Sequence, residues 1–320
     1  MTSSQLVEVE QNVSNLFKRF ETGDFYNTLY QQFHKIKEQV NYQKRRRPVQ
    51  VAELTDDNKE RIKFLAQEKN IQSPKIDDLK FLSQFIGVTD VEIREKYVLK
   101  TIVECIKKHY YSENQLIWLK DFILNPDNLY AHILEPKNNA VLVRSSVLLI
   151  LNALLVEDEK FYNLLSPQDY QKIALKLVTY SLLEQDYQGY NPKMGWIQTY
   201  SLIVEATKKI CEAPVHRALK VYLVTAVLFA YLQTDVPLIF GENQVLAELV
   251  LTFSLRDNFY NHFIVMLLTQ WNDQYKDDYS SNEQLGFWHQ VYNSERLIDS
   301  LLVLEDLPES ISNLIRNEIK

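Results

Sequence analysis

The chain has 320 residues, of which 46% are hydrophobic and 24% charged, as in an ordinary soluble globular protein. Its formal net charge of -7 disfavours a nucleic-acid partner. Six glycines and nine prolines are few for this length, which disfavours an all-β fold with many tight turns. Length alone predicts about two domains, although repeat architectures depart from that rule.

The first 74 residues are expected to form an N-terminal helical appendage, which ends near Pro74 in a polar stretch. Amphipathic patterns predict helices over 5–20 and 25–42. Four basic residues, 44–47, follow the second helix, where positive charge suits the unpaired carbonyls of a helix end. Contact with nucleic acid or with a membrane surface is the functional alternative for this cluster.

From residue 75 onward the apolar pattern predicts helices in pairs, and we expect residues 75–320 to form one helical-repeat domain. The predicted pairs are 76–86 with 90–109, 113–124 with 141–156, 167–183 with 197–212, 215–232 with 243–255, and 257–271 with 283–304, followed by a capping helix over 308–320. The pairs recur at intervals close to the ~40–47-residue unit of HEAT and armadillo arrays. The expected fold is all-α, an α-α superhelix of stacked antiparallel helix pairs, with a globular helical bundle as the competing arrangement.

The sequence shows neither a secretion signal nor a membrane anchor. The longest apolar runs, 147–156 and 221–232, are shorter than the ~20 residues that a membrane span needs, and both predict buried helices. The N-terminus lacks a basic region followed by an apolar one. Cys105 and Cys211 lie far apart in apolar helical contexts, which indicates buried reduced thiols. We therefore expect a cytoplasmic protein without membrane contact.

The segment over 181–217 is the most informative part of the chain. It predicts the end of one helix, a polar loop over 185–193, and a second helix that opens at Gly195-Trp196. The loop contains two tyrosines together with one glycine and one proline, which indicates an ordered connection. We expect Trp196 to anchor this loop against a neighbouring helix pair.

Four segments of the chain are distinctive in their order and spacing. They are LSQFIGVTDVEIREKYV (82–98), LVRSSVLLILNALL (142–155), LLEQDYQGYNPKMGWIQTYSLIVEA (182–206) and IFGENQVLAEL (239–249). Together they resemble the bacterial domain of unknown function 2785 family, over roughly residues 78–255. The resemblance implies a single helical, HEAT-like domain and no established activity.

The family pattern has D-x-R-G-Y in the loop and G-W-x-H-x-x-x-H-x-x-D on the following helix. This chain has Gln188 where the loop pattern has arginine, and Gln198 and Leu202 where the helix pattern has two histidines. Glu205 replaces the aspartate of that pattern. Two histidines and a carboxylate would suit a metal or acid–base set, and Gln198 and Leu202 cannot supply imidazoles. We therefore expect no metal ion and no cofactor.

Other positions follow the family pattern more closely. Arg144 and Ser145 match an earlier arginine-containing segment, and Glu242 belongs to a later G-E-D-x-R-L-A segment. In that later segment Asn243 and Val245 replace an acidic and a basic residue. The candidate binding residues, which lie in or beside these motifs, are Arg144, Asp186, Tyr187, Tyr190, Trp196, Gln198, Glu205 and Glu242.

Two classes of function remain. We favour a non-catalytic helical-repeat protein that binds a protein or peptide on its concave face, because the sequence contains no Gly-rich phosphate loop, no H-E-x-x-H and no G-x-S-x-G. Its many tyrosines suit a recognition surface, with core packing as the alternative role. The other class is an enzyme, or a degenerate relative of one, in which Arg144, Asp186, Glu205 and Glu242 line an acidic pocket for a small polar substrate.

Overall fold

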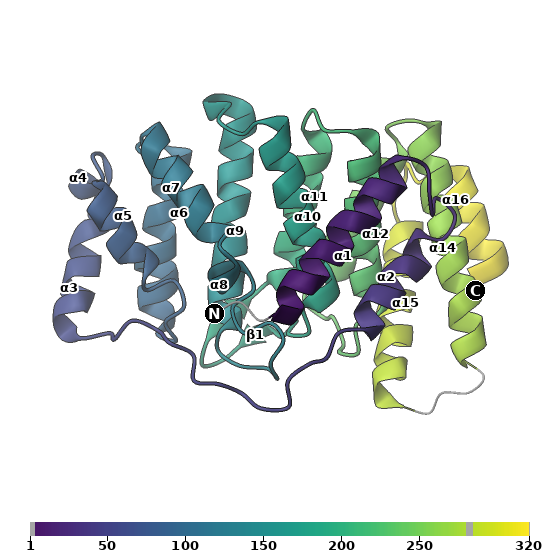
Figure 1. Ribbon diagram of the computed structural model, residues 1–320, viewed down its shortest axis with the longest axis horizontal. Coiled ribbons are helices and arrows are strands. Elements are labelled where there is room, and N and C mark those ends of the chain that lie inside the picture. Colours follow the sequence, from purple (N-terminus) through teal and green to yellow (C-terminus); the bar gives the residue numbers. More distant parts are fainter. Residues whose placement is uncertain (1–3, 280–283, 320) are drawn as a thin grey trace. The chain divides into compact units, whose positions relative to one another are not determined.

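The computed structural model describes residues 4–279 and 284–319, and within them nearly all regular structure is helical (Figure 1). The exception among these residues is a two-stranded ladder, so the predicted all-α class is confirmed. Contacts within the chain divide it into two compact units. Unit 1 comprises Asn41–Ile173 and Glu184–Leu202, and unit 2 comprises Ser4–Val40, Ala174–Leu183 and the residues from Ile203 onward.

The division between the units falls inside two helices. α10 (Pro167–Leu183) and α11 (Thr199–Glu212) each contribute residues to both units. Residues 4–40 belong to unit 2 and residues 41–74 to unit 1. The boundary expected at residue 74 and the stacking of all pairs into one superhelix stay predictions.

Unit 1 is built around α9 (Val141–Glu157), whose buried apolar residues lie on all sides of the helix. Such a pattern is typical of a helix that is covered all round, and α9 is contacted by α6, α7, α8 and β2 (Figure 1). The remaining elements of unit 1 are α3 (Asp56–Leu65), α4 (Glu68–Ile71), α5 (Ile76–Ser83), η1 (Glu92–Leu99), α6 (Lys100–Lys107), α7 (Glu113–Ile123), α8 (Pro126–Leu129), η2 (Asp158–Tyr162), β1 (Gly189–Asn191) and β2 (Gly195–Ile197).

The segment η1 is π-helical and continues directly into α6. The sequence predicts one regular helix over 90–109, and the structure differs in the wider turns of its first half. Asp90 Oδ1 accepts a hydrogen bond from Ile93 N at 3.0 Å at the start of η1. Because π-helical segments are rare and occur frequently at functional sites, η1 marks a region of interest in unit 1.

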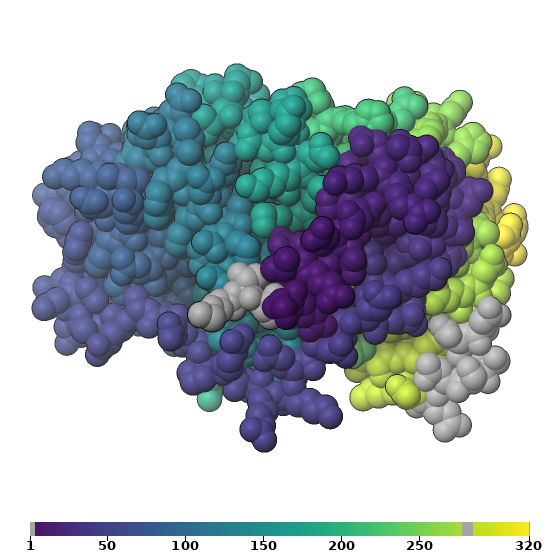
Figure 2. Space-filling view, in the orientation of Figure 1, coloured from purple at the N-terminus to yellow at the C-terminus, as the bar shows by residue number. Residues whose placement is uncertain are grey.

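Unit 2 is built around α12 (Arg217–Leu232), which α1, α2, α14 and α15 contact. Aromatic rings join α2 to α12: the centroids of Phe33 and Tyr222 lie 4.9 Å apart and those of Tyr30 and Phe229 lie 5.0 Å apart. Figure 2 shows α1 and α2, in purple, covering later helices of the same unit. The other elements of unit 2 are α1 (Ser4–Glu21), α2 (Leu29–Glu38), α13 (Glu242–Ser254), α14 (Asn258–Tyr279), α15 (Leu285–Leu302), α16 (Glu309–Leu314) and η3 (Ile315–Ile319).

The apolar pattern of the sequence predicted most helices closely. The helices expected over 113–124, 141–156 and 167–183 are α7, α9 and α10, each within one residue of the expected ends. The loop expected over 185–193 is ordered, but it contains β1, which the sequence did not predict. The expectation that Gly195-Trp196 opens the second helix was wrong, because both residues lie in β2 and α11 begins at Thr199. Within the described residues, no helix combines the length and the apolar character that crossing a bilayer requires.

Candidate functional site

The loop between α10 and α11 is organised by the antiparallel ladder of β1 and β2. Its register places Tyr190 opposite Trp196. Their ring centroids lie 5.2 Å apart at an interplanar angle of 60°, and the residues are 47% and 46% exposed. The turn between the strands is closed by Met194 N, which donates to Asn191 O at 3.1 Å. The ladder therefore presents two large aromatic side chains at the surface of unit 1.

A buried arginine fastens this turn to η1. Arg94 is 2% exposed and donates to Val88 O at 2.8 Å, to Glu95 Oε1 at 2.7 Å and to Met194 O. Gly195 has φ +76°, and a Cβ atom at this position would collide with the Glu95 carboxylate. The loop can approach η1 this closely because residue 195 has no side chain.

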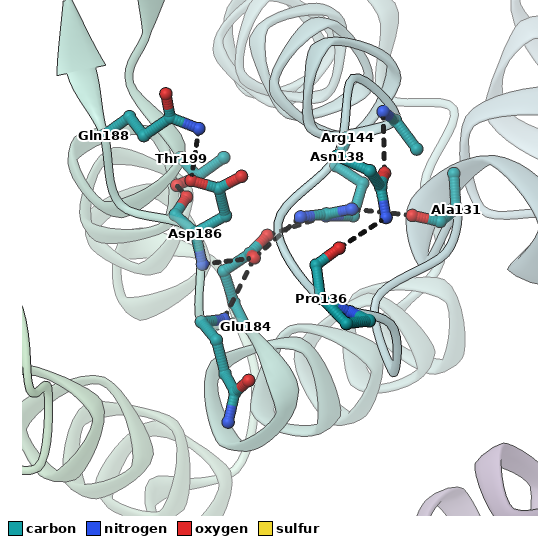
Figure 3. Close-up of polar contacts among 10 residues, drawn as sticks. Ala131, Pro136, Asn138, Arg144, Glu184, Asp186, Gln188 and Thr199 are labelled. Atoms are coloured by element: carbon teal, nitrogen blue, oxygen red, sulfur yellow. Dashed lines mark hydrogen bonds and ion pairs between the residues drawn. The ribbon is translucent and has the colours of Figure 1, made fainter. Parts of the chain in front are cut away.

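A second buried arginine holds the start of the loop (Figure 3). Arg144 grips the Glu184 carboxylate with two hydrogen bonds, from Nε to Oε2 at 2.7 Å and from Nη2 to Oε1 at 2.8 Å. Arg144 Nη1 donates to Ala131 O at 2.6 Å. Glu184 Oε1 also accepts from the backbone nitrogens of Gln185 and Asp186, at 3.0 and 2.9 Å. This bidentate pair fixes the path of the chain as it leaves α10.

Asp186 is a buried carboxylate that is only partly satisfied. Its Oδ1 accepts from Gln188 Nε2 at 2.7 Å (Figure 3), whereas its Oδ2 has no hydrogen-bond partner in the described structure. Its backbone oxygen accepts from Thr199 Oγ1 at 3.2 Å. Burial raises the pKa of Asp186, and the Gln188 bond and the Arg144 charge oppose that effect.

Tyr187 is a core residue, unlike Tyr190 and Trp196. Its ring packs edge-on against Tyr200 with centroids 5.7 Å apart, and it is buried. Its hydroxyl has no hydrogen-bond partner in the described structure, and burial raises its pKa well above the usual value. Tyr187 therefore cannot contact a partner directly.

An apolar cavity of about 300 Å³ lies beside the ladder, and Trp196 lines it together with Gln198 and Leu202. Gln198 and Leu202 are the two positions at which the family pattern has histidines, so both face one space. The remaining apolar walls come from α6, α9 and the end of η1: Leu99, Val103, Leu142 and Leu149. We call this space the apolar cavity.

Two polar groups in the apolar cavity have unused hydrogen-bonding capacity. Ser145 is buried and lines the cavity, and its hydroxyl makes no hydrogen bond within the described part of the chain. The exposed Gln198 amide likewise has no hydrogen-bond partner among the described residues. Ser146 differs, because its hydroxyl donates to Ile86 O at 2.7 Å. The cavity thus combines apolar walls with a hydroxyl and an amide that a ligand could engage.

The remaining two candidate residues, Glu205 and Glu242, belong to unit 2. Glu205 has a half-exposed side chain whose Oε1 lies 3.6 Å from Lys208 Nζ. Glu242 opens α13, where its buried Oε2 accepts from Phe240 N at 2.8 Å. Such a carboxylate stabilises the N-terminus of its helix. Local contacts within unit 2 account for both residues.

Sequence reasoning missed Arg94, which binds the turn of the loop, and Glu184, which binds its start. Arg94 precedes Val98 by four residues, so both lie on the buried face of one helix. A charged residue in an apolar stripe is the signal that could have indicated a buried ion pair. Glu184 directly follows the buried end of α10, and its partner Arg144 lies 40 positions earlier.

Neither thiol in the chain is in a state that favours nucleophilic attack or metal binding. Burial raises the pKa of Cys105 to about 11 and that of Cys211 to about 12. Both are free and buried, as expected, and a protonated thiol is a poor nucleophile and metal ligand. Among residues 4–279 and 284–319, no three His, Cys, Asp or Glu side chains gather as a metal ion would require.

Comparison with known proteins identifies the family and no function. No match was found among curated proteins or among solved structures. The family model described as "Protein of unknown function (DUF2785)" matches residues 129–303, more than half of the chain. That range contains Arg144, the ladder and much of the apolar cavity, and the chain therefore belongs to the DUF2785 family.

Proposed function

We propose that this chain is a non-catalytic helical protein that binds a protein or peptide partner, with an apolar side chain of the partner seated in the apolar cavity. The observation that carries the proposal is the position of Trp196. This residue is half exposed, pairs with Tyr190 across the ladder and lines the cavity. Tryptophan and tyrosine are enriched among the residues that contribute most to protein interfaces.

The size and chemistry of the apolar cavity suit a side-chain anchor. Its volume of about 300 Å³ is at the lower end of the ~300–1,000 Å³ that ligand pockets span. Apolar walls favour an aliphatic or aromatic group through the hydrophobic effect. The Ser145 hydroxyl and the Gln198 amide offer hydrogen bonds to the backbone of an extended peptide.

The loop that carries Trp196 is also held by hydrogen bonds at two points, which favours binding. Arg94 fixes the turn through Met194 O, and Arg144 fixes the start of the loop through Glu184. A surface that is already ordered loses less conformational entropy when a partner binds.

The alternative, an enzyme with an acidic pocket, has less support. Asp186 and Arg144 lie in unit 1, and both contact Glu184. Neither residue lines the apolar cavity. A general acid or base must reach the substrate, and a carboxylate held away from this cavity is better explained as part of the loop anchor.

A peptide-display selection against the full chain tests the proposal. We expect peptides that share an apolar residue, and their binding should change the fluorescence of the protein. Leu149→Arg places a charge in the wall of the apolar cavity, and we expect it to weaken binding by at least roughly tenfold. Ile117→Arg is the matched control, because Ile117 and Leu149 are both 37% exposed and Ile117 lies outside the cavity. Equal effects of the two substitutions, or no selected peptide, would contradict the proposal.

A further inference from the structure

A second cavity in unit 1, of about 280 Å³, adjoins the apolar cavity through one shared residue. Lys100 lines both spaces. Three lysines face the second cavity: Lys96, Lys100 and Lys108. Lys96 and Lys100 lie one turn apart on η1 and α6, and Lys108 directly follows α6. We call this space the lysine cavity.

The charge of the lysine cavity is opposite in sign to that of the whole chain. Its three lysines face two glutamates, Glu68 and Glu104, which leaves one positive charge in excess. The chain as a whole carries a net charge of -7. Lys96 Nζ lies 3.1 Å from Glu92 Oε1 and Lys100 Nζ lies 3.8 Å from Glu104 Oε1, whereas Lys108 makes no ion pair within the described part of the chain. The lining therefore favours an anionic group over a cationic one.

Aromatic and hydroxyl groups complete the lysine cavity. Tyr97 and Tyr110 line it, and the ammonium groups of Lys63 and Lys96 stand 5.8 and 5.4 Å from the centroid of the Tyr97 ring. These cation–π contacts hold two positive charges close to the cavity wall. The Tyr97 hydroxyl and Lys96 Nζ donate to Glu92 Oε1, at 3.4 and 3.1 Å, so Lys108 is the lining lysine that is available to a ligand carboxylate.

Thr101 adds a hydroxyl to the lining of this cavity. It is only 4% exposed and lines the cavity, and its hydroxyl makes no hydrogen bond in the residues that the structure describes. The hydroxyl is therefore available to water or to a ligand as a hydrogen-bonding group. Thr101 follows the π-helical turns of η1. In proteins generally, such turns are frequent at functional sites.

From these contacts we infer that the lysine cavity binds an acidic side chain of the same partner whose apolar side chain fills the apolar cavity. The inference rests on the proposed function and extends it, since it defines the partner as an acidic peptide segment with an apolar residue near a carboxylate. The shared Lys100 is the reason to assign both groups to one ligand. Charge complementarity is the reason to choose an acidic group.

The composition of selected peptides tests the inference first. Peptides displayed at random and selected on the full chain should be enriched in Asp or Glu close to the apolar residue. Selected peptides without acidic enrichment would overturn the inference and leave the proposed function intact. Failure to select any peptide would overturn both, so the two failures are distinguishable.

Charge reversal at adjacent positions gives a sharper test with a synthetic selected peptide. We expect Lys108→Glu to weaken binding roughly tenfold, because Lys108 lines the lysine cavity. Lys107→Glu makes the same charge change one residue away, outside the lining, and should change the affinity by less than roughly twofold. Replacing the peptide's carboxylate by its amide should abolish the difference between the two variants. Equal losses for both variants would indicate a general field effect and overturn the inference.

Removal of a single hydroxyl tests the assignment of Thr101. Thr101→Val keeps the shape of the side chain and removes its hydrogen-bonding group. We expect it to weaken the acidic peptide roughly fivefold and to leave the binding of the amide form unchanged. An equal effect on both peptides would contradict a contact between Thr101 and the carboxylate.

Discussion

The two halves of the loop between α10 and α11 differ in how far their side chains are buried. The first half, from Glu184 to Tyr187, is mostly buried and is fixed by Arg144. The second half, the ladder, leaves Tyr190 and Trp196 nearly half exposed. Both halves lie within the sequence that resembles the family, so the resemblance alone does not separate the residues that hold the loop from those that are available to a partner.

The two halves differ in whether their side chains have binding partners within the protein. Arg144 and Glu184 satisfy each other, and the pair also reaches three backbone groups of unit 1. Trp196 instead borders a cavity that no protein atom fills. We therefore assign the first half of the loop to stability and the second half to binding, and the following predictions test that division.

The largest expected effect on stability comes from breaking the Arg144–Glu184 pair. Arg144→Ala leaves a buried carboxylate without its counter-charge, which should lower the free energy of unfolding by ~3–5 kcal/mol. Urea denaturation followed by circular dichroism measures it. Replacing both partners, with Arg144→Met and Glu184→Leu, should cost less than the single change because no buried charge remains.

An exposed ion pair in unit 1 provides the control for that experiment. Lys59→Ala removes the 3.8 Å contact with the exposed Asp56, and it should change stability by less than ~1 kcal/mol. If Arg144→Ala were as mild as Lys59→Ala, the buried pair would not hold the loop.

The next effect concerns the close approach of the turn to η1. Gly195→Ala introduces a Cβ that collides with the Glu95 carboxylate at a φ of +76°, and we expect a loss of ~1–3 kcal/mol in unfolding free energy. Gly23→Ala is a matched control, since Gly23 has φ +102° and nothing within 4 Å of an added Cβ. The control measures backbone strain alone, and equal losses in both variants would argue against close packing of the turn.

Substitution of Trp196 should separate stability from binding. Trp196→Ala removes one ring of an exposed pair, which should cost only ~0.5–1.5 kcal/mol in stability, yet it should abolish detectable binding of a selected peptide. Tyr187→Phe removes a buried hydroxyl that has no partner, and we expect no loss of stability or of binding. A peptide that binds Trp196→Ala as tightly as the unmodified chain would break the assignment of the ladder to binding.

The sequence predicted the helices because their signal is local. The apolar residues of α9 and α10 repeat within a single helix, and such periodicity requires no knowledge of neighbours. The ladder was missed because each strand is only three residues long and includes a glycine. The turn between the strands is bound by Arg94, which lies 100 positions before the Met194 carbonyl.

The candidate site was predicted only in part, because sequence motifs indicate individual residues but not which of them come together in space. Family motifs led to Trp196 and Gln198, and the structure places both at one cavity. The same motifs included Glu205 and Glu242, whose contacts are local to unit 2. Neither cavity was predictable, because their walls combine segments that are distant in sequence and come together only in the folded chain.

The smallest expected effect is a pH dependence that originates at Asp186. Because burial raises its pKa in the folded state, the folded chain binds this proton more tightly than the unfolded chain does. The associated stabilisation is fully present below the ordinary aspartate pKa of ~3.9 and is lost as the pH rises through the raised value. Asp186→Asn does not titrate, so its stability relative to the unmodified chain should increase from acid toward neutral pH. Urea denaturation across that range measures the difference.

The hydrogen bond from Gln188 sharpens this last prediction, because it favours the ionised form of Asp186. Gln188→Ala should lower stability at neutral pH in the unmodified background more than in the Asp186→Asn background. A constant difference between Asp186→Asn and the unmodified chain at every pH would show that this carboxylate is not desolvated. In that case the first half of the loop would be open to solvent, as the second half is, and the contrast between them would fail.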